Sequence, residues 1–250
     1  DEKIAALIRI PSKTGPNKED QTWGQAGELF FATRQGTVKK TSLSEFANVR
    51  KGGIIAITID SGDTLIDVKL TKGSKVEPDS QVSDPGNDVV LITREGMSIR
   101  FAESGVRSMG RSATGVRGIT LERTDAVVAL SIVVPDATLL VAGENGIGKR
   151  TDFGEYRVQS RGGKGIITMK TTDKTGGVVG ALSVRDTDEI MLITVGGQMV
   201  RTRVSDIREA GRNTQGVKLI ELDQNDKLQA IASVVSEEKQ DAEPEPEAPK

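Results

Sequence analysis

The apolar residues of this chain form short stretches separated by glycine turns, and the whole pattern repeats. Each copy consists of an apolar strand, a turn glycine and a second strand. The four copies are LFFATRQGTVKKTSLSEF from Leu29, VVLITREGMSIRFAESGV from Val89, LLVAGENGIGKRTDFGEY from Leu139 and IMLITVGGQMVRTRVSDI from Ile190. Their turn glycines, Gly36, Gly96, Gly146 and Gly197, are 60, 50 and 51 residues apart. The chain is therefore a tandem repeat with a period of about fifty residues.

Each copy continues with two further apolar stretches, so four short strands are expected per repeat. The third strands are IIAITI from Ile54, VRGITL from Val116, GIITMK from Gly165 and GVKLIE from Gly216. The fourth strands are DTLIDVKL from Asp63, DAVVALSI from Asp125, GVVGALSV from Gly177 and DKLQAIAS from Asp226. Short strands rich in Val, Ile and Thr between glycine turns predict an all-β, propeller-like disc of four-stranded antiparallel blades. A single repeat cannot bury both faces of its sheet, so its neighbours should complete its core.

This pattern divides the chain into a bladed domain over residues 1–235 and a tail over 236–250. We expect blades at about 27–71, 87–134, 137–184 and 188–235, and a partial blade over 1–22 that includes EKIAALIRI from Glu2. A loop rich in Pro, Gly, Ser and Asp over 72–88 explains the longer first interval.

Composition removes most catalytic chemistry from consideration. The absence of cysteine and histidine excludes disulfides, the usual zinc ligand sets, thiol nucleophiles and imidazole bases. No run of eighteen apolar residues is present, so we expect a cytoplasmic protein without a membrane span. The net charge is −2, but residues 237–250 contribute six acidic residues against two lysines, or −4, which leaves +2 for the rest. The bladed domain is therefore mildly basic, and the acidic tail is expected to be disordered, either as a solvating end or folded over basic residues in competition with a polyanion.

Cations occur at matching positions of the repeats. Four residues after each turn glycine stands Lys40, Arg100, Arg150 or Arg201, and fifteen residues after it stands Lys51, Arg111, Arg161 or Arg212. On a ring of blades, equivalent positions would place these charges on the same rim of every unit. DNA carries about one negative charge per 1.7 Å of helix axis, which such a track would match. Phosphate contacts are predicted for these eight residues and for Lys39, Lys149, Lys164 and Arg203. No motif that reads base edges is present, so the expected binding is non-specific.

Three other features are interpreted as structural. Residues 143–150, GENGIGKR, nearly match a phosphate-binding loop, but Arg150 replaces the required hydroxyl residue and a strand is expected after it instead of a helix. Tyr156 occupies a repeat position that holds Phe46, Val106 and Ile207 elsewhere, so it is expected to pack between strands. The remaining aromatic residues are also expected to pack in the core: Trp23, Phe30, Phe31, Phe46, Phe101 and Phe153.

These repeats resemble the C-terminal domain of the DNA gyrase A subunit, a type IIA topoisomerase component, over about residues 1–235. The resemblance rests on FFATRQGTVKKT, GVRSMGRSATGVRGI, NGIGKRT and VRTRVSDIREAGRNTQGV. It implies a β-pinwheel, a six-bladed disc whose blades exchange strands and whose perimeter binds and bends duplex DNA so that the enzyme introduces negative supercoils. It also implies partnership with the other domains of the A subunit, and with the B subunit, in an A2B2 enzyme of the nucleoid. No cofactor is expected in this chain, whereas other domains of the parent enzyme would use ATP and Mg²⁺.

The chain also departs from the pattern of that family. The family's gyrase box, QRRGGKG, normally precedes the first blade, but the closest match is QSRGGKG at residues 159–165 in the third repeat: Gln159, Ser160, Arg161, Gly162, Gly163, Lys164 and Gly165. This segment is either a displaced box or, as we favour, the ordinary basic loop of its repeat. Two alternative interpretations stay open: the C-terminal domain of topoisomerase IV, which lacks the box, and a protein-interaction propeller.

Overall fold

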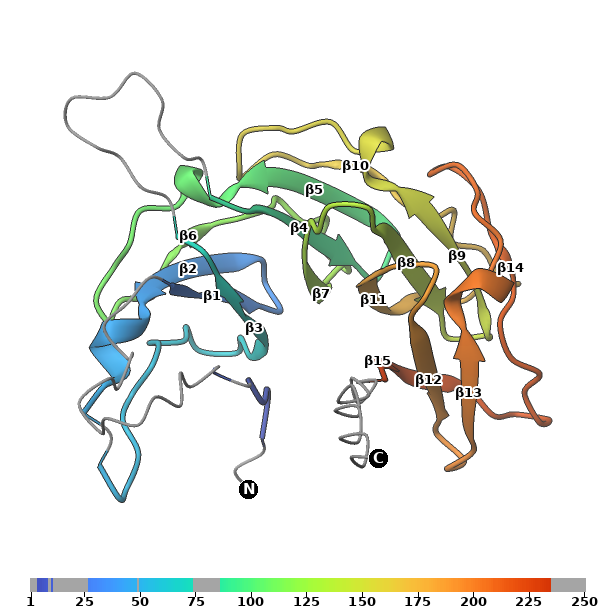
Figure 1. Cartoon of the computed structure of the whole chain (residues 1–250), viewed down its shortest axis with the longest axis horizontal. Helices are drawn as coiled ribbons and strands as arrows, with labels where there is room; N and C mark the ends of the chain where they lie inside the picture. The colour runs from blue at the N-terminus through green and yellow to red at the C-terminus, as the bar shows by residue number, and fades with distance from the viewer. Residues whose placement is uncertain (1–3, 9, 11–26, 49, 74–85, 235–250) are drawn as a thin grey trace, which may run out of the picture.

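Four blades follow one another along an arc (Figure 1). The computed structural model describes residues 4–8, 10, 27–48, 50–73 and 86–234. Each blade has a central strand, an inner strand on the concave side and an outer strand on the convex side. The first blade contains β1 (Glu28–Thr33), β2 (Thr37–Ser42) and β3 (Leu65–Thr71); the second β4 (Asp88–Thr93), β5 (Met97–Ala102) and β7 (Val127–Ile132); the third β8 (Thr138–Gly143), β9 (Ile147–Asp152) and β11 (Val178–Val184); the fourth β12 (Glu189–Thr194), β13 (Met199–Arg203) and β15 (Leu228–Ser233). The predicted all-β, propeller-like fold is confirmed.

The fourth strand of a blade comes from the next repeat. The short strands β6 (Val116–Arg117), β10 (Ile166–Ile167) and β14 (Val217–Lys218) pair with the outer strands of the first, second and third blades. The resulting strand orders are β3-β1-β2-β6, β10-β5-β4-β7 and β11-β8-β9-β14. The strand exchange implied by the family resemblance is therefore confirmed: the third apolar stretch of a repeat joins the blade before it, so a blade does not coincide with a repeat.

The two ends of the arc show what this exchange leaves open. Within the described residues, the fourth blade has only the order β13-β12-β15, and β13 has no strand on its outer edge. The predicted first-repeat strand IIAITI, at residues 54–59, is not paired in any described sheet. Its Ile55 side chain is 71% exposed, and Met199 on the open β13 edge is 59% exposed. Residues 54–59 have the sequence of an exchanged strand but no described outer strand to join, whereas β13 is an outer strand to which no described exchanged strand is added.

The hydrophobic core lies between blades. Successive residues of a strand point to opposite faces of the sheet, so a central strand that is apolar throughout can pack on two neighbours. In β1, Phe30 and Ala32 pack toward the second blade, whereas Leu29 and Phe31 face the other way. Ala6, Ile8 and Ile10 of the N-terminal segment pack on that second face. Most of the predicted partial blade over 1–22 and the tail over 236–250 lie outside the described residues, as does Trp23.

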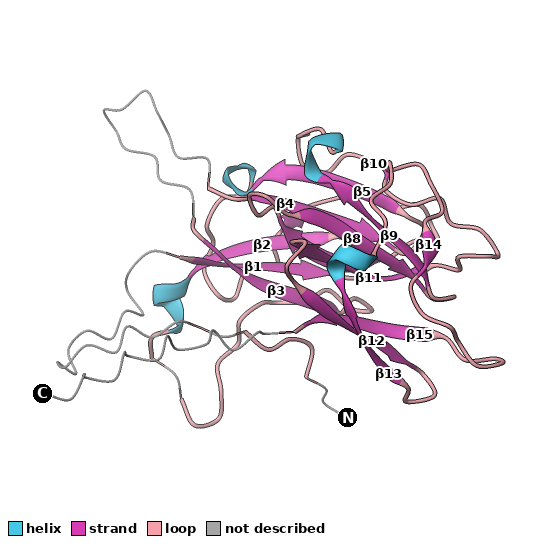
Figure 2. Cartoon of the chain, turned by 45° about the vertical axis from the view of Figure 1, so that its right-hand side comes forward, coloured by secondary structure: helices cyan, strands magenta, loops and turns pink. Residues whose placement is uncertain are grey.

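The packing roles expected for the other aromatic residues are confirmed. Phe30, Phe31, Phe46, Phe101 and Phe153 are buried. Tyr156 is also buried, and its hydroxyl group lies 2.7 Å from Thr168 Oγ1. A short 3-10 turn follows each outer strand (Figure 2). The turns of the first, third and fourth blades carry a buried apolar residue, whereas the buried residue of the second is Glu103. These turns are η2 (Leu43–Phe46), η3 (Glu103–Gly105), η4 (Phe153–Glu155) and η5 (Val204–Asp206). No helix in the described ranges is long and apolar enough to cross a membrane.

A glycine precedes each exchanged strand at the point where it approaches the neighbouring blade. Gly165 has φ +77°, and a Cβ atom there would lie 2.2 Å from the Ser98 carbonyl oxygen of the blade before it. Gly115 and Gly216 have the same left-handed backbone and would meet the Val38 and Gly148 carbonyls. Gly53, the equivalent residue of the first repeat, has φ +75° but nothing within 4 Å. The backbone conformation is thus shared by all four, whereas the close contact occurs only where strands are exchanged.

This difference provides an internal control for the stability of the exchanged strand. We expect Gly53→Ala to lower the free energy of unfolding by about 1–2 kcal/mol, the cost of a left-handed alanine. Gly165→Ala should add the cost of displacing β10 from β5, for a total of about 3 kcal/mol or more. Urea unfolding of the two variants measures the difference. Equal losses would show that β10 does not depend on the close approach.

Candidate nucleic-acid interface

The convex surface is built from three equivalent loops that cross from one blade to the blade before it. These junction loops, residues 107–115, 157–165 and 208–216, follow the 3-10 turns and lead to the exchanged strands. Backbone hydrogen bonds dock each loop on the preceding outer strand. Met109 N–H donates to the Lys40 carbonyl at 2.8 Å, Gln159 N–H to Arg100 at 2.8 Å and Ala210 N–H to Arg150 at 2.9 Å. Each junction therefore presents the same loop on the outer rim.

The cations four residues after the turn glycine do not extend from this rim. Lys40 and Arg150 are buried and Arg100 is half-buried. Lys40 pairs with Glu28 at 2.8 Å and Arg100 with Asp88 at 2.7 Å. In each of these two blades, the carboxylate lies eight residues before the turn glycine, across the antiparallel β-hairpin from the cation. The surface position that we expected for this set is wrong in the first three blades, because the strand directs these side chains into the junction.

The arginines of this set also bind the neighbouring blade. Arg100 donates from Nη1 to the carbonyl oxygen of Phe153, at 2.7 Å, in the 3-10 turn of the third blade. Arg150 donates from Nε to the carbonyl oxygen of Ile207, at 2.6 Å, and pairs with Asp186. Arg201, on the open edge of the fourth blade, pairs with Glu189 and remains 59% exposed. At this position Arg100 and Arg150 therefore bind the blade that follows, whereas Lys40 pairs with Glu28 of its own blade.

Lys39 and Lys149 are also buried, contrary to the expectation of surface phosphate contacts. The Lys39 ammonium group donates to the carbonyl oxygens of Ala56, at 2.6 Å, and Arg111. The Lys149 ammonium group donates to those of Arg212, at 2.6 Å, and Gly211. Burial lowers the pKa of each lysine from 10.5 to about 8. For Lys149, nearby Glu155 acts in the opposite direction and Arg212 reinforces the decrease. These lysines fix junction loops from beneath.

The cations fifteen residues after the turn glycine bind backbone carbonyls of the preceding repeat. Arg111 Nη1 donates to Ile55 O at 3.3 Å, Arg161 Nη1 to Arg117 O at 3.2 Å and Arg212 Nη1 to Ile167 O at 2.8 Å. The three acceptors occupy the same position of successive repeats. Lys51, the member from the first repeat, is exposed.

Exposed arginines that the sequence analysis missed occupy a further repeated position. Arg107, Arg157 and Arg208 begin the three junction loops, eleven residues after the turn glycine, and all three side chains are exposed. The first repeat has Ala47 at this position, which hid the pattern in a comparison that required a cation in all four copies. The signal was nonetheless present, because the next repeat position after Phe46, Val106, Tyr156 and Ile207 is basic in three of four copies.

The remaining predicted contacts lie on the surface. Arg203 is exposed at the end of β13. Lys164 is exposed and forms an ion pair with Glu122 at 2.9 Å, and this hydrogen bond raises the pKa of the lysine. Both Lys164 and Arg161 belong to QSRGGKG at 159–165. Because Arg161 and Gly165 make the same contacts as their equivalents in the other junctions, this segment has the geometry of an ordinary junction loop.

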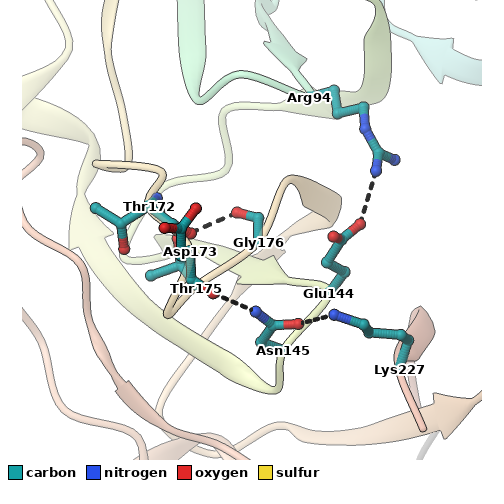
Figure 3. Close-up of polar contacts among 8 residues, drawn as sticks. All are labelled: Arg94, Glu144, Asn145, Thr172, Asp173, Thr175, Gly176 and Lys227. Carbon is teal, nitrogen blue, oxygen red and sulfur yellow. Dashed lines mark hydrogen bonds and ion pairs between the residues drawn. The ribbon is translucent and has the colours of Figure 1, made fainter. Parts of the chain in front are cut away.

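The hairpin turns at the other end of the blades carry mixed charge (Figure 3). Arg94 Nη2 of the second blade pairs with Glu144 Oε2 of the third at 2.7 Å, and Lys227 of the fourth blade donates to Asn145 of the third. Asn145 Nδ2 donates in turn to the Asp173 carbonyl at 2.8 Å. The segment 143–150 that partly matches a phosphate-binding loop is this turn between β8 and β9, and a strand follows it as predicted. Its polar side chains join blades to one another.

The fold and its rim define a class of protein: a propeller-like repeat protein with exchanged strands and a basic convex surface. Residues 27–72, 87–133, 137–185 and 188–234 match the family described as DNA gyrase C-terminal domain, beta-propeller. The chain belongs to this family.

Individual relatives agree with that assignment. The chain is 46% identical over 244 residues to the DNA gyrase A subunit of Salmonella typhimurium and 44% identical over 208 residues to that of Haloquadratum walsbyi. These matches cover 96% and 82% of this chain, but 25% and 23% of the relatives. The chain thus spans about a quarter of the length of the curated relatives that it matches.

Two solved structures have the same fold. The structure of a DNA gyrase A C-terminal domain matches with a TM-score of 0.73 and 26% identity, over 84% of this chain and 66% of that one. The crystal structure of the C-terminal domain of DNA topoisomerase IV matches with a TM-score of 0.75 and 26% identity, over 85% and 63%. Structure alone does not separate these two kinds of domain, whereas the sequence relatives cited above are gyrase subunits.

The buried lysines predict an unusual dependence of stability on pH. Between pH 8 and 10.5 the unfolded chain keeps the proton of Lys149 that the folded chain has lost, so the free energy of unfolding should rise with pH. Lys149→Met should remove about 1–2 kcal/mol of that rise. The full change in pKa would correspond to roughly 3 kcal/mol, but solvent near the ammonium group reduces this value. Chemical denaturation across this pH range measures the effect. Exposed Lys174→Met is the control, and a Lys149→Met curve parallel to wild type would contradict the assignment.

Proposed function

We propose that this domain binds duplex DNA non-specifically along its convex surface and bends it around the arc of blades. The observation that carries the proposal is the recurrence of an exposed arginine at the start of all three junction loops: Arg107, Arg157 and Arg208. Each loop is docked on the blade before it, so the three charges are held at intervals fixed by the blades. A rigid series of cations suits the regular phosphates of a duplex better than it suits a flexible acidic chain.

The set of candidate phosphate contacts is smaller than the sequence predicted, because several of the predicted lysines are buried and several of the predicted arginines bind backbone carbonyls. Exposed Lys51, Lys164, Arg201 and Arg203 remain candidate contacts beside the three loop arginines. Bending a segment of 20–30 bp through 40–90° costs on the order of 1–6 kcal/mol, so several of these contacts must act together. The junction loops contain no helix that could enter the major groove, which supports binding without sequence preference.

In the parent protein we infer a non-catalytic role for this domain within the gyrase A subunit. DNA held on the convex surface would be presented to the remainder of that polypeptide and to a B subunit, whose ATP-dependent strand passage would introduce negative supercoils. The family assignment supports this proposal, as do the gyrase subunits among the relatives. A topoisomerase IV parent is the alternative supported by the structural match.

The salt dependence of DNA affinity tests the proposed surface. In the triple variant Arg107→Ala, Arg157→Ala, Arg208→Ala, the slope of log affinity against log salt should become shallower by about 2.7, or 0.9 for each lost phosphate contact. At 0.1 M salt this corresponds to a loss in affinity of roughly 10²- to 10³-fold. Fluorescence anisotropy with a random-sequence duplex measures both quantities.

A second triple variant that removes the same charge elsewhere distinguishes binding at the convex surface from attraction to the total charge of the domain. The variant Arg34→Ala, Arg123→Ala, Arg185→Ala also removes three exposed arginines, all from turns outside the junction loops. It should keep nearly the wild-type slope. If both triple variants lose affinity equally, binding follows total charge and the convex surface is not the site. If wild type shows no salt-dependent binding to duplex DNA, a protein-interaction role becomes the better interpretation.

A further inference from the structure

The junction loops are joined to one another as well as to the blades. Thr58 Oγ1 of the first repeat donates to Ser112 O at 2.7 Å. Thr120 N–H of the second repeat donates to Gly163 O at 2.9 Å, and Lys170 N–H of the third donates to Thr214 O at 2.9 Å. Each bond connects the segment that follows an exchanged strand, or its equivalent in the first repeat, with the junction loop of the next repeat. The convex surface is therefore a continuous belt of loops linked in series.

The arginine fifteen residues after the turn glycine is the side chain that strengthens this belt at every junction. Arg161 shows the arrangement most fully, because its Nε donates to Gly105 O at 2.8 Å and its Nη1 to Arg117 O at 3.2 Å. These two carbonyls lie just before and just after the preceding junction loop, which carries Arg107. One guanidinium group thus spans both ends of the loop next to its own.

We propose that Arg111, Arg161 and Arg212 are positioning residues for DNA binding. They hold the belt in register so that Arg107, Arg157 and Arg208, each four residues earlier in its loop, meet phosphates along the duplex at intervals set by the blades. The proposal rests on the proposed function and revises the role of residues that the sequence pattern assigned to direct phosphate contact. A guanidinium group suits this role because its donors form a planar fork, whereas an ammonium group offers one compact donor centre.

Substitution by lysine separates positioning from direct contact, because it keeps the charge and removes the fork. A phosphate contact tolerates lysine, since either cation displaces counterions from DNA. The link from Gly105 O to Arg117 O should be weakened by lysine, since the separate Nε and Nη1 donors of the guanidinium group are replaced by one ammonium group on a shorter side chain. Arg157→Lys and Arg157→Ala provide the matched pair at a proposed phosphate contact in the same loop.

The expected results differ between the two positions. Arg157→Ala should lower affinity about eightfold at 0.1 M salt and make the slope shallower by about 0.9, whereas Arg157→Lys should stay within about threefold of wild type. Arg161→Lys and Arg161→Ala should weaken binding to a similar degree, by severalfold, with the slope nearly unchanged. When Arg161→Lys is added to the double variant Arg107→Ala/Arg157→Ala, DNA affinity should fall by less than a further twofold, because the residues that Arg161 positions are absent.

Two outcomes would overturn the inference. If Arg161→Lys binds like wild type while Arg161→Ala loses 0.9 from the slope, Arg161 contacts phosphate directly. If Arg161→Lys lowers DNA affinity as much in the Arg107→Ala/Arg157→Ala variant as in wild type, Arg161 acts independently of those two arginines. Thermal melting of each variant identifies global unfolding, in which case Arg111→Lys supplies the same comparison at the first junction.

A measurement without DNA keeps this test distinct from that of the proposed function. Hydrogen exchange should be at least severalfold faster at the Gly118 and Thr120 amides in Arg161→Lys than in wild type. The Gly118 amide shares its peptide bond with the Arg117 carbonyl that Arg161 binds, and the Thr120 amide donates to Gly163 O in the loop of Arg161. Unchanged exchange would show that the arginine does not hold the belt. If exchange is faster in Arg161→Lys but the wild-type protein does not bind DNA, the role of Arg161 in the belt is supported and the proposed function is rejected.

Discussion

The structure depends on the backbone hydrogen bonds by which each repeat completes the sheet of the repeat before it. Two residues of β6, β10 or β14 close the outer edge of a blade, and the chain that leads to them becomes a junction loop on the convex surface. A glycine with positive φ is needed at the crossing, because a side chain there would collide with the neighbouring strand. Strand exchange, the inter-blade core and the position of the basic surface therefore have one geometric origin.

The same exchange explains why basic residues have two different roles. Carbonyl oxygens accumulate where a loop from one repeat crosses the edge of another, and these acceptors need donors when they are removed from water. Lys39, Lys149, Arg111, Arg161 and Arg212 supply such donors. Only cations that project beyond the crossing, such as Arg157, are free to neutralise an external polyanion. A count of repeated lysines and arginines therefore overstates the binding surface.

The repeat, the fold class and the loops that carry the candidate surface could be predicted from sequence, because they follow from apolar periodicity and glycine spacing. The burial of Lys39 and Lys149 was missed, although their equivalents Ile99 and Val200 are aliphatic, because lysine is rarely buried and these two donate to carbonyl oxygens of other repeats. Arg107, Arg157 and Arg208 were recognisable as a repeated position, but Ala47 in the first copy removed them from a pattern that demanded four matches. The periodicity identified the third strand of each repeat as a strand but does not reveal which sheet it joins, and only the family resemblance implied that blades exchange strands.

The offset between repeat and blade has a consequence for dissecting this domain into smaller pieces. A cut at a sequence boundary, such as the one between β11 and β12, would keep three complete repeats but only two complete four-stranded sheets, because β14 would be removed from the third blade. Cutting instead after β14 would preserve the third sheet at the cost of leaving the fourth repeat without its inner strand β15. No single division of the chain respects both kinds of unit. The blades are modules in space but not in the polypeptide, so deletion or exchange of the second, third or fourth repeat alters two blades.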